Sequence, residues 1–347
     1  MKQACLLLFH FLFLFAGTMA SQEQFRVMFY NVENLFDTEK EPNKNDNEFL
    51  PTGKKYWNNK KYYQKQNNLA KVITSIGEWS TPALIGMCEV ENDKVLEHLT
   101  KRTPLKSQKY KFIVTDCDDL RGIDVALLYQ PDQFKLLGHN AYKIHFKSKK
   151  KISRDILHAY GLIKNKDTLD VFVCHYPSRT GGEKQSEPDR IRASEVLREK
   201  ADSIYRTRKH ANIIIMGDFN DTPSNKSMAT TLRAQNYKEY PKKNSRGLQL
   251  YNLSFRFDKQ AGKGTYKYQG NWEQLDQMIV SGRLLDNTSG CYTIPNNYKI
   301  YDADFLFTKD TSKGGKRPKR TYFGMKYEGG FSDHLPIYAD FYITLRP

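Results

Sequence analysis

The sequence NIIIMGDFND, residues 212–221, is the most informative part of the chain about its architecture. Its residues 213–216 form an unbroken apolar run, mostly isoleucine, a pattern typical of a strand buried on both faces. Gly217 allows a tight turn, and Asp218 and Asn220 follow directly. Polar groups at the end of a buried strand lie where α/β proteins place their chemistry. An Asx-rich turn without function is the alternative, and this stretch alone does not decide between them.

Further apolar runs along the chain are also bordered by polar side chains. ALIGMC (residues 83–88) is followed by Glu89, and TLDVFVC (residues 168–174) is followed by His175. A buried, ionised carboxylate is costly without a partner, so a metal ion or another cation is expected beside Glu89. The other positions of this kind are Asn31 and Glu33 at the end of the run 25–32, Asp276 before the run 278–280, and Asp333 and His334 before the run 337–343.

Strands are frequent along the chain, and helices are fewer. Helices are predicted for a segment that runs through Trp79, for a segment that begins near Asn92, and for residues 185–209 and 224–235. No internal repeat or low-complexity linker divides residues 21–347. The pattern predicts one domain in which two β-sheets stack face to face with helices on the outer surfaces.

The chain is basic, with a formal net charge of +16 over 347 residues. This charge favours anionic partners: nucleic acid, phosphorylated small molecules or acidic lipid head groups. Lysine is nevertheless scattered, as it is on an ordinary soluble surface. TSKGGKRPKR, residues 311–320, is a compact basic loop between aromatic residues. It is the best candidate to contact a phosphate backbone, with a purely solvated loop as the alternative.

The first twenty residues have the pattern of a secretory signal peptide. Lys2 supplies a positive start, residues 4–15 are almost entirely apolar, and small residues precede Ser21. The apolar core is too short to span a membrane comfortably. We therefore expect cleavage after Ala20 and export to the periplasm or the cell exterior. No later stretch is apolar enough to cross a bilayer.

Cysteine spacing argues against a structural zinc site. Cys5 lies in the predicted signal peptide, and the remaining four cysteines contain no C-x-x-C pair. Export permits disulfides, but buried free thiols are equally compatible with the sequence, so the pairing stays open. The four cysteines are Cys88, Cys117, Cys174 and Cys291.

The polar groups at the strand ends are oxygen ligands and imidazoles. Carboxylate and amide oxygens suit a hard divalent ion, Mg²⁺ or Mn²⁺, better than zinc. Hydrolysis of a phosphoester benefits from such an ion because charge grows on the phosphate oxygens during attack by water. Arg179 has a planar fork suited to phosphate, Arg190 lies near the start of the following predicted helix, and Arg121 has either a substrate role or a purely structural ion pair.

The segments YNVEN, MCEVEN, CHYPS, GDFND, QLDQMIVS and SDHLPI occur in this order along the chain. This set resembles the endonuclease/exonuclease/phosphatase superfamily of deoxyribonuclease I-like enzymes, and its exported bacterial members in particular. The resemblance covers nearly all of residues 21–347. It implies a single catalytic domain with a four-layer α/β/β/α sandwich, two mixed β-sheets packed face to face with helices outside.

The resemblance also implies metal ligands. Glu89 matches the metal-binding glutamate of the superfamily, and Asn31 matches an asparagine beside that metal. Glu33 falls where some members carry a second acidic ligand. Asp333 matches an acidic residue near the metal or the leaving group. The number of metal ions, one or two, is left open.

The remaining matches imply catalytic roles. Asp218 matches the residue that orients or deprotonates the attacking water, and Asn220 matches an amide that steadies the phosphate. His334 matches the histidine that contacts the scissile phosphate, and Asp276 matches the aspartate that pairs with it. His175 lies where deoxyribonuclease-type members carry a histidine that donates to the phosphate or the leaving group.

The leading hypothesis for function is an exported nuclease that hydrolyses nucleic-acid phosphodiesters by in-line attack of water. Its alternative is a phosphatase or phosphodiesterase for inositol phosphates, nucleotides or phospholipid head groups, in which Arg179, Arg190 and Lys184 would form a closed monoester pocket. A non-catalytic polyanion-binding module is the third hypothesis. We expect a monomer without a protein partner. The sequence does not decide whether the substrate is DNA or RNA, or whether cleavage is endonucleolytic or exonucleolytic.

Overall fold

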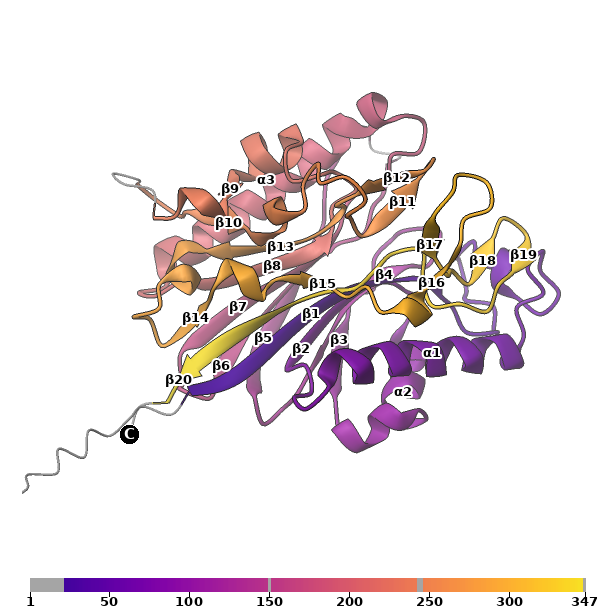
Figure 1. Ribbon diagram of the computed structural model, residues 1–347, viewed down its shortest axis with the longest axis horizontal. Coiled ribbons are helices and arrows are strands. Elements are labelled where there is room, and N and C mark those ends of the chain that lie inside the picture. Colours follow the sequence, from indigo (N-terminus) through magenta and orange to yellow (C-terminus); the bar gives the residue numbers. More distant parts are fainter. Residues whose placement is uncertain (1–21, 149–150, 242–245, 346–347) are drawn as a thin grey trace, which may run out of the picture.

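The computed structural model describes residues 22–148, 151–241 and 246–345. The predicted signal peptide, residues 1–20, lies outside the described residues, so export stays a prediction. Figure 1 shows two large sheets stacked face to face, with helices on both outer surfaces. This arrangement confirms the predicted α/β/β/α sandwich.

The first sheet contains the two ends of the described chain. It consists of β1 (Gln22–Leu35), β2 (Leu84–Val90), β3 (Lys111–Val114), β4 (Asp124–Tyr129), β14 (Cys291–Thr293), β15 (Lys299–Ile300) and β20 (Ile337–Thr344). The order is β14-β20-β1-β2-β4-β3, and β15 also pairs with β20. β1 runs parallel to β2 and antiparallel to β20, so Gln22 pairs with Thr344 at the edge of this ladder.

The second sheet is organised around the isoleucine run. It consists of β5 (Phe134–Tyr142), β6 (Ile156–Ile163), β7 (Thr168–His175), β8 (Asn212–Asp218), β9 (Ala234–Asn236), β10 (Leu250–Asn252) and β13 (Asp276–Ser281). The order is β5-β6-β7-β8-β13-β10-β9, and β8 lies in the centre with every residue buried. Strand β8 needs apolar side chains on both faces because one faces the other sheet and one faces a helix.

Three longer helices cover the sheets. α1 (Asn59–Gly77) and α2 (Asp93–Lys101) pack on the first sheet, and α3 (Glu183–Thr207) packs on the second. The side chain of Asn92 caps α2 by accepting a hydrogen bond from the backbone N–H of Val95, as the sequence predicts. No helix of the described residues is long and apolar enough to cross a bilayer.

Two local predictions are wrong. Residues 224–235 were expected to form a helix, but helical turns cover only Ser227–Leu232 and strand β9 follows at once. Arg233 adopts a left-handed φ of 59°, which ends the helical turns and sends the chain back to pair with β10. The predicted helix through Trp79 ends at Gly77 instead, leaving the Trp79 side chain fully exposed.

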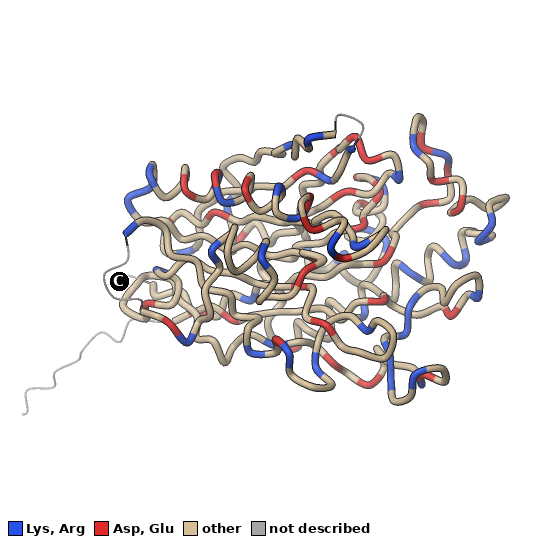
Figure 2. Tube along the Cα trace, turned by 90° about the horizontal axis from the view of Figure 1, so that it is seen from above, with Lys and Arg blue, Asp and Glu red and all other residues tan. Residues whose placement is uncertain are grey.

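Three small two-stranded elements gather at one end of the sandwich (Figure 1). They are β11 (Tyr266–Tyr268) with β12 (Asn271–Glu273), β16 (Phe307–Lys309) with β17 (Lys316–Pro318), and β18 (Tyr322–Phe323) with β19 (Lys326–Tyr327). The basic stretch 311–320, expected to be a loop, therefore forms the turn and second strand of a hairpin. Lys and Arg recur on the loops at this end (Figure 2).

Candidate active site

Strand register brings the predicted residues of the second sheet together. In the parallel pair β7–β8, His175 pairs with Asp218, and in the antiparallel pair β8–β13, Asp218 pairs with Asp276. All three side chains are buried. Because each comes from the end of a regular strand, their spacing is fixed by the hydrogen-bonded ladder and not by loops.

Asp218 lies at the centre of the cluster. Its Oδ2 accepts a hydrogen bond from Asn31 Nδ2 at 3.0 Å, and its Oδ1 accepts one from the backbone N–H of Asn220 at 2.9 Å. The Nε2 atoms of His175 and His334 each lie 3.8 Å from Asp218 Oδ2. Burial raises the pKa of Asp218, and the nearby His334 ring opposes this rise. A carboxylate placed in this way is suited to orient a water molecule and accept its proton.

His334 is held in one orientation by two contacts. Its Nδ1 lies 2.7 Å from Asp276 Oδ2, and its ring packs on Tyr266 with 4.7 Å between the ring centroids. Burial disfavours the charged ring, but the carboxylates of Asp276 and Asp218 outweigh burial and hold the pKa of His334 well above its ordinary value. His334 is therefore a cationic donor whose Nε2 faces Asp218, in keeping with the expected Asp276–His334 pair.

The first sheet contributes oxygen ligands beside Asp218. Glu89 Oε1 accepts a hydrogen bond from Asn31 Nδ2 at 3.3 Å, and Glu89 Oε2 accepts one from the backbone N–H of Asn34 at 2.9 Å. Glu33 Oε2 accepts a hydrogen bond from the Thr321 N–H at 2.7 Å and lies 3.9 Å from Lys65 Nζ. Burial, followed by the carboxylate of Asp333, raises the pKa of Glu33 to about 7.

The backbone around these ligands is strained. Glu33, Asn34, Glu89 and Asn220 have φ values of 51°, 52°, 63° and 50°. The register of the first sheet shifts between Asn31 and Leu35 and again between Cys88 and Val90. Such irregularities turn side chains out of the regular strand direction, and a non-glycine residue in the left-handed region costs on the order of 1–3 kcal/mol. The strain clusters where the candidate ligands converge.

The donor set fits a hard divalent cation. Burial, followed by the carboxylate of Asp333, raises the pKa of Glu89, which is the expected result when several carboxylates share a site with too little positive charge. The carboxylates of Asp218 and Asp276 and the ring of His334 also have ligand atoms within 4.8 Å of one another. Among the described residues, the clusters with ligand atoms this close do not include Glu33, Glu89 or Asp333. The predicted ligand set of Glu89, Asn31, Glu33 and Asp333, whose oxygens suit Mg²⁺ or Mn²⁺, therefore stays a prediction.

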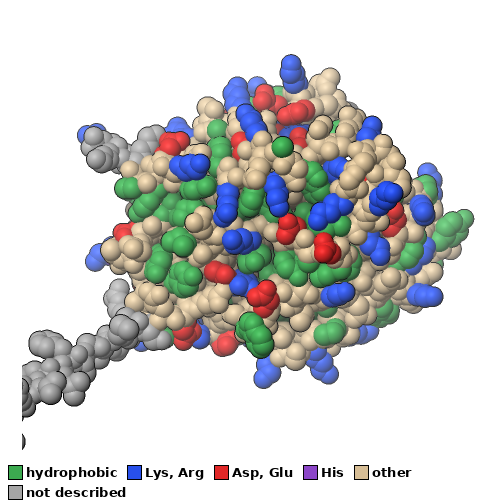
Figure 3. All heavy atoms as spheres, in the orientation of Figure 1, with side chains coloured by type: hydrophobic (Ala, Val, Ile, Leu, Met, Phe, Trp, Pro, Cys, Tyr) green, Lys and Arg blue, Asp and Glu red, His purple; other side chains and the backbone are tan. Residues whose placement is uncertain are grey.

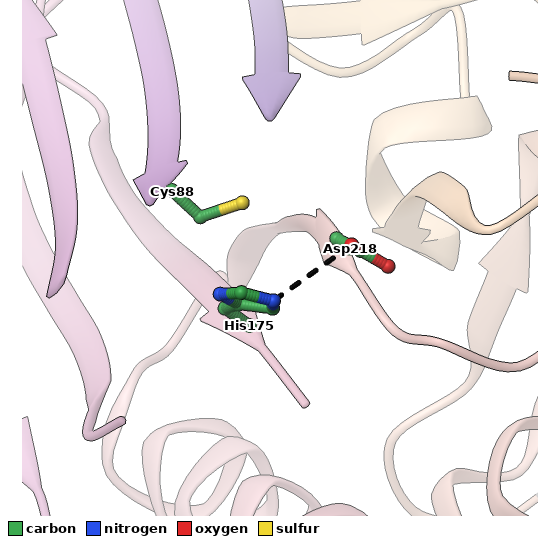
Figure 4. A group of neighbouring side chains, drawn as sticks. All are labelled: Cys88, His175 and Asp218. Atoms are coloured by element: carbon green, nitrogen blue, oxygen red, sulfur yellow. Dashed lines mark ion pairs between the residues drawn. The ribbon is translucent and has the colours of Figure 1, made fainter. Parts of the chain in front are cut away.

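His175 and Cys88 lie beside Asp218 (Figure 4). His175 Nε2 lies 3.9 Å from Glu89 Oε1, and its Nδ1 has no hydrogen-bond partner among the described residues. Burial, together with the charges of Arg154 and Arg121, lowers the pKa of His175 well below its ordinary value. The Cys88 thiol faces the same cluster, a position that the sequence did not predict for a cysteine.

The prediction that Arg190 binds substrate is wrong. Arg190 is fully buried, its Nε lies 2.8 Å from Asp221 Oδ1, and its Nη1 donates to Ser186 Oγ at 2.7 Å. Arg179 is also occupied, because its Nε donates to the Asn220 carbonyl at 2.7 Å and its Nη1 lies 2.8 Å from Glu273 Oε1. These two arginines hold the loop that carries Asn220, so they do not line a closed phosphate pocket.

Arg121 and Arg154 form a second pair of cations near the cluster. Both approach Asp119, with Nη2 of Arg121 at 3.4 Å and Nη1 of Arg154 at 3.3 Å from its Oδ2. Arg154 Nη2 also donates to the Tyr176 carbonyl at 2.7 Å, while its Nε has no partner among the described residues. Arg121 is half exposed, as a substrate contact requires. Arg154 was not among the predicted site residues, and its only signal in the sequence is an Arg-Asp pair just before strand β6.

The four cysteines that follow the predicted signal peptide are buried and unpaired in the described part of the chain. At these four positions the structure therefore has free thiols and not disulfides. Burial raises the pKa of the Cys88 thiol well above its ordinary value, so this thiol is protonated in the absence of a metal ion.

Comparison with solved structures identifies proteins that share this fold. An endonuclease/exonuclease/phosphatase family protein from Bacteroides thetaiotaomicron is 14% identical with a TM-score of 0.54, and the match covers 94% of this chain and 97% of that chain. The mannosyl-6-phosphatase Bt3783 from the same organism is 16% identical, with a TM-score of 0.56 and coverage of 91% and 99%. TDP2 of D. rerio, in complex with a single-strand DNA product, is 15% identical, with a TM-score of 0.53 and coverage of 92% and 98%.

Comparison with curated proteins gave no match. A family model described as endonuclease/exonuclease/phosphatase family, in contrast, matches residues 26–343, which include every candidate site residue. The chain therefore belongs to the endonuclease/exonuclease/phosphatase family of divalent-metal-dependent phosphoric ester hydrolases.

Proposed function

We propose that this enzyme is a Mg²⁺-dependent nuclease that hydrolyses nucleic-acid phosphodiesters. The observation that carries the proposal is the exposed ring of Phe323 beside two arginines, and we call Phe323, Arg317 and Arg320 the platform. The side chains of Arg317 and Arg320 are 11% and 19% exposed, and Arg317 is paired with Glu328. Phe323 is 45% exposed, and the guanidinium carbons of Arg317 and Arg320 lie 4.3 Å and 5.7 Å from its ring centroid. Arg320 Nη1 lies 4.0 Å from Asp333 Oδ2, next to His334.

A platform of this kind suits a chain substrate. An exposed ring can stack on a base whatever the sequence, and flanking cations follow the phosphate backbone. Elsewhere Lys and Arg side chains are spread over the molecule and do not form one patch on the face shown in Figure 3. The platform therefore supports a polymer substrate more specifically than the net charge does.

The side chains of the cluster then have distinct proposed roles. Asp218 orients the attacking water and accepts its proton, while the amide of Asn220 steadies the phosphate. His334, held by Asp276, donates to the phosphate from Nε2, and neutral His175 donates on the opposite side of Asp218. When bound by Glu89, Asn31, Glu33 and Asp333, the cation would stabilise the negative charge that develops on the phosphate oxygens.

The test is an assay of purified residues 21–347 with Mg²⁺, Mn²⁺ or chelator. Plasmid DNA, RNA, sugar phosphates, inositol phosphates and a chromogenic diester are the substrates. We expect metal-dependent cleavage of nucleic acid. We also expect Phe323→Ala to raise the KM for a single-stranded oligonucleotide about tenfold, since stacking of one base contributes about 1–3 kcal/mol, with the rate on the chromogenic diester unchanged.

Trp79→Ala is the matched control, because Trp79 is an exposed aromatic residue at the opposite end of α1. Equal effects of the two substitutions would contradict the platform. Phosphate release from monoesters without cleavage of nucleic acid would contradict the nuclease proposal.

A second candidate function is a phosphatase for small phosphomonoesters. Arg154 and Arg121 favour it, because two cations on one side of the cluster suit a dianionic phosphate. The shared fold with a mannosyl-6-phosphatase points to sugar phosphates as the first monoesters to assay. Under this candidate Arg154→Lys would abolish monoester hydrolysis and Phe323→Ala would leave it intact.

Export as a monomer is part of the proposal. The apolar segment and small residues of the first twenty positions support it. Expression of the full chain and of residues 21–347, followed by fractionation, tests export, and sedimentation of the purified enzyme tests its oligomeric state. Retention of the full chain in the cytoplasm would contradict the localisation.

A further inference from the structure

We propose that Cys88, His175 and Asp218 form a second metal site, selective for thiophilic divalent ions such as Zn²⁺ and Cd²⁺, whose occupation inhibits the enzyme. One ligand atom from each side chain lies within 4.8 Å of the other two. Figure 4 shows the thiol, the imidazole and the carboxylate facing one another from three neighbouring strand ends. A sulfur, a nitrogen and an oxygen ligand are the donors that zinc accepts in a tetrahedral site.

A second observation points to a ligand at this position. His175 is buried, and its Nε2 lies 3.8 Å from Asp218 Oδ2 and 3.9 Å from Glu89 Oε1. Both distances are too long for a hydrogen bond, and they leave room for an ion between Nε2 and the two carboxylates. Glu89 Oε1 is close enough to supply a fourth donor.

The site differs in chemistry from the hard-cation site that it adjoins. Mg²⁺ has little affinity for thiolate or imidazole, whereas zinc and cadmium prefer them. Binding of a thiophilic ion exchanges the Cys88 thiol proton, which leaves to water, for a metal–sulfur bond. The ion would then bind Asp218, the proposed acceptor of the water proton. It would also bind Glu89, a proposed ligand of the hard cation. Both losses stop hydrolysis, so zinc inhibits even in excess Mg²⁺.

The first test reads metal binding without activity and therefore does not depend on the proposed nuclease function. Co²⁺ is added to the wild-type enzyme and to Cys88→Ser, and thiolate-to-cobalt charge-transfer absorption is recorded. We expect the band in the wild type and its loss in Cys88→Ser. The matched control is Cys291→Ser, which removes a buried free thiol from the opposite end of the first sheet. Circular dichroism verifies that both variants are folded.

The second test measures inhibition by zinc at saturating Mg²⁺, relative to the zinc-free rate of each variant. We expect the zinc concentration for half inhibition to rise at least about tenfold in Cys88→Ser, because even ligand-orienting residues change metal affinity by ~10–100-fold, and to stay unchanged in Cys291→Ser. No charge-transfer band in the wild type, a band retained in Cys88→Ser, or equal inhibition of the wild type and Cys88→Ser would each overturn the site.

Discussion

The two sheets contribute to the catalytic cluster in different ways. His175, Asp218 and Asp276 come from the second sheet, where the strand register is continuous across β7, β8 and β13. Glu33 and Glu89 come from the first sheet, where the register shifts and both residues have positive φ values of 51° and 63°. Three of the proposed catalytic residues are thus held by regular ladders, whereas two of the proposed cation ligands lie on backbone with positive φ.

This difference has an energetic meaning. A regular ladder fixes a side chain at no cost in strain, whereas each left-handed residue costs on the order of 1–3 kcal/mol. Binding of a cation stabilises the folded state and can offset that cost. We infer that the second-sheet half of the site is formed without metal, while the first-sheet half gains most of its stability when the cation binds. The predictions below test this division.

Asp218→Asn should give the largest effect. Loss of the proton acceptor is expected to lower kcat by about 10²–10⁴-fold at every metal concentration. The amide retains the size of the carboxylate, so the melting temperature should change little. Steady-state kinetics over a Mg²⁺ series checks this, with the remote, exposed Asp132→Asn as control. Wild-type turnover in Asp218→Asn would refute the role of this residue.

Glu89→Gln should behave differently, because the prediction concerns a ligand and not the proton acceptor. The Mg²⁺ concentration for half-maximal rate is expected to rise at least about tenfold, with partial recovery of rate at high Mg²⁺. Thermal unfolding with and without Mg²⁺ should show a smaller metal-induced stabilisation than in the wild type. A loss of rate that no Mg²⁺ concentration relieves would contradict the proposal that the first sheet holds the cation while the second sheet holds the proton acceptor.

Asp124 tests the cost of burying charge at the same end of the first sheet. Burial raises its pKa to about 6 from 3.8, although Thr115 and the Cys117 N–H donate to its Oδ1. The folded state therefore binds the proton more tightly. The tighter binding of this proton stabilises the folded state fully below pH 4. This stabilisation is lost as the pH rises through about 6.

Asp124→Asn should remove this pH dependence, which amounts to as much as about 3 kcal/mol. Urea unfolding of the wild type and the variant between pH 4 and 7 measures the difference. If the free energy of unfolding changed with pH in the same way for the two proteins, Asp124 would titrate in the folded state as it does in the unfolded chain.

Asn34 should give the smallest effect. Its φ of 52° costs nothing for glycine, and it costs asparagine less than most other residues. Asn34→Ala is therefore expected to lower the free energy of unfolding by about 1 kcal/mol. Asn34→Gly should keep the free energy of unfolding within about 1 kcal/mol of the wild-type value. Chemical unfolding of both variants measures this. Equal stability of the two would mean that the backbone is not strained at this position.

The sequence predicts the strands and the residues at their ends because that signal is local. An apolar run followed by Asp218 or Glu89 needs no knowledge of distant residues. It does not predict the bulges that turn Glu89 into the site, since a register shift depends on how two strands pair. The partner of Arg190 is equally hidden, because Asp221 meets it only after α3 packs on the second sheet.

The pairing of β1 with β20 also sets the order in which the enzyme can be completed. Asn31 and His334 lie 303 positions apart, and the ladder from Gln22 to Phe29 has to wait for residues 337–344 before it can close. A contact between such distant segments forms late, because a long loop must be closed first. A chain that still lacks β20 has no strand to join β1 to β14, and His334 lies only three residues before β20. We therefore expect no phosphoester cleavage before β20 pairs with β1.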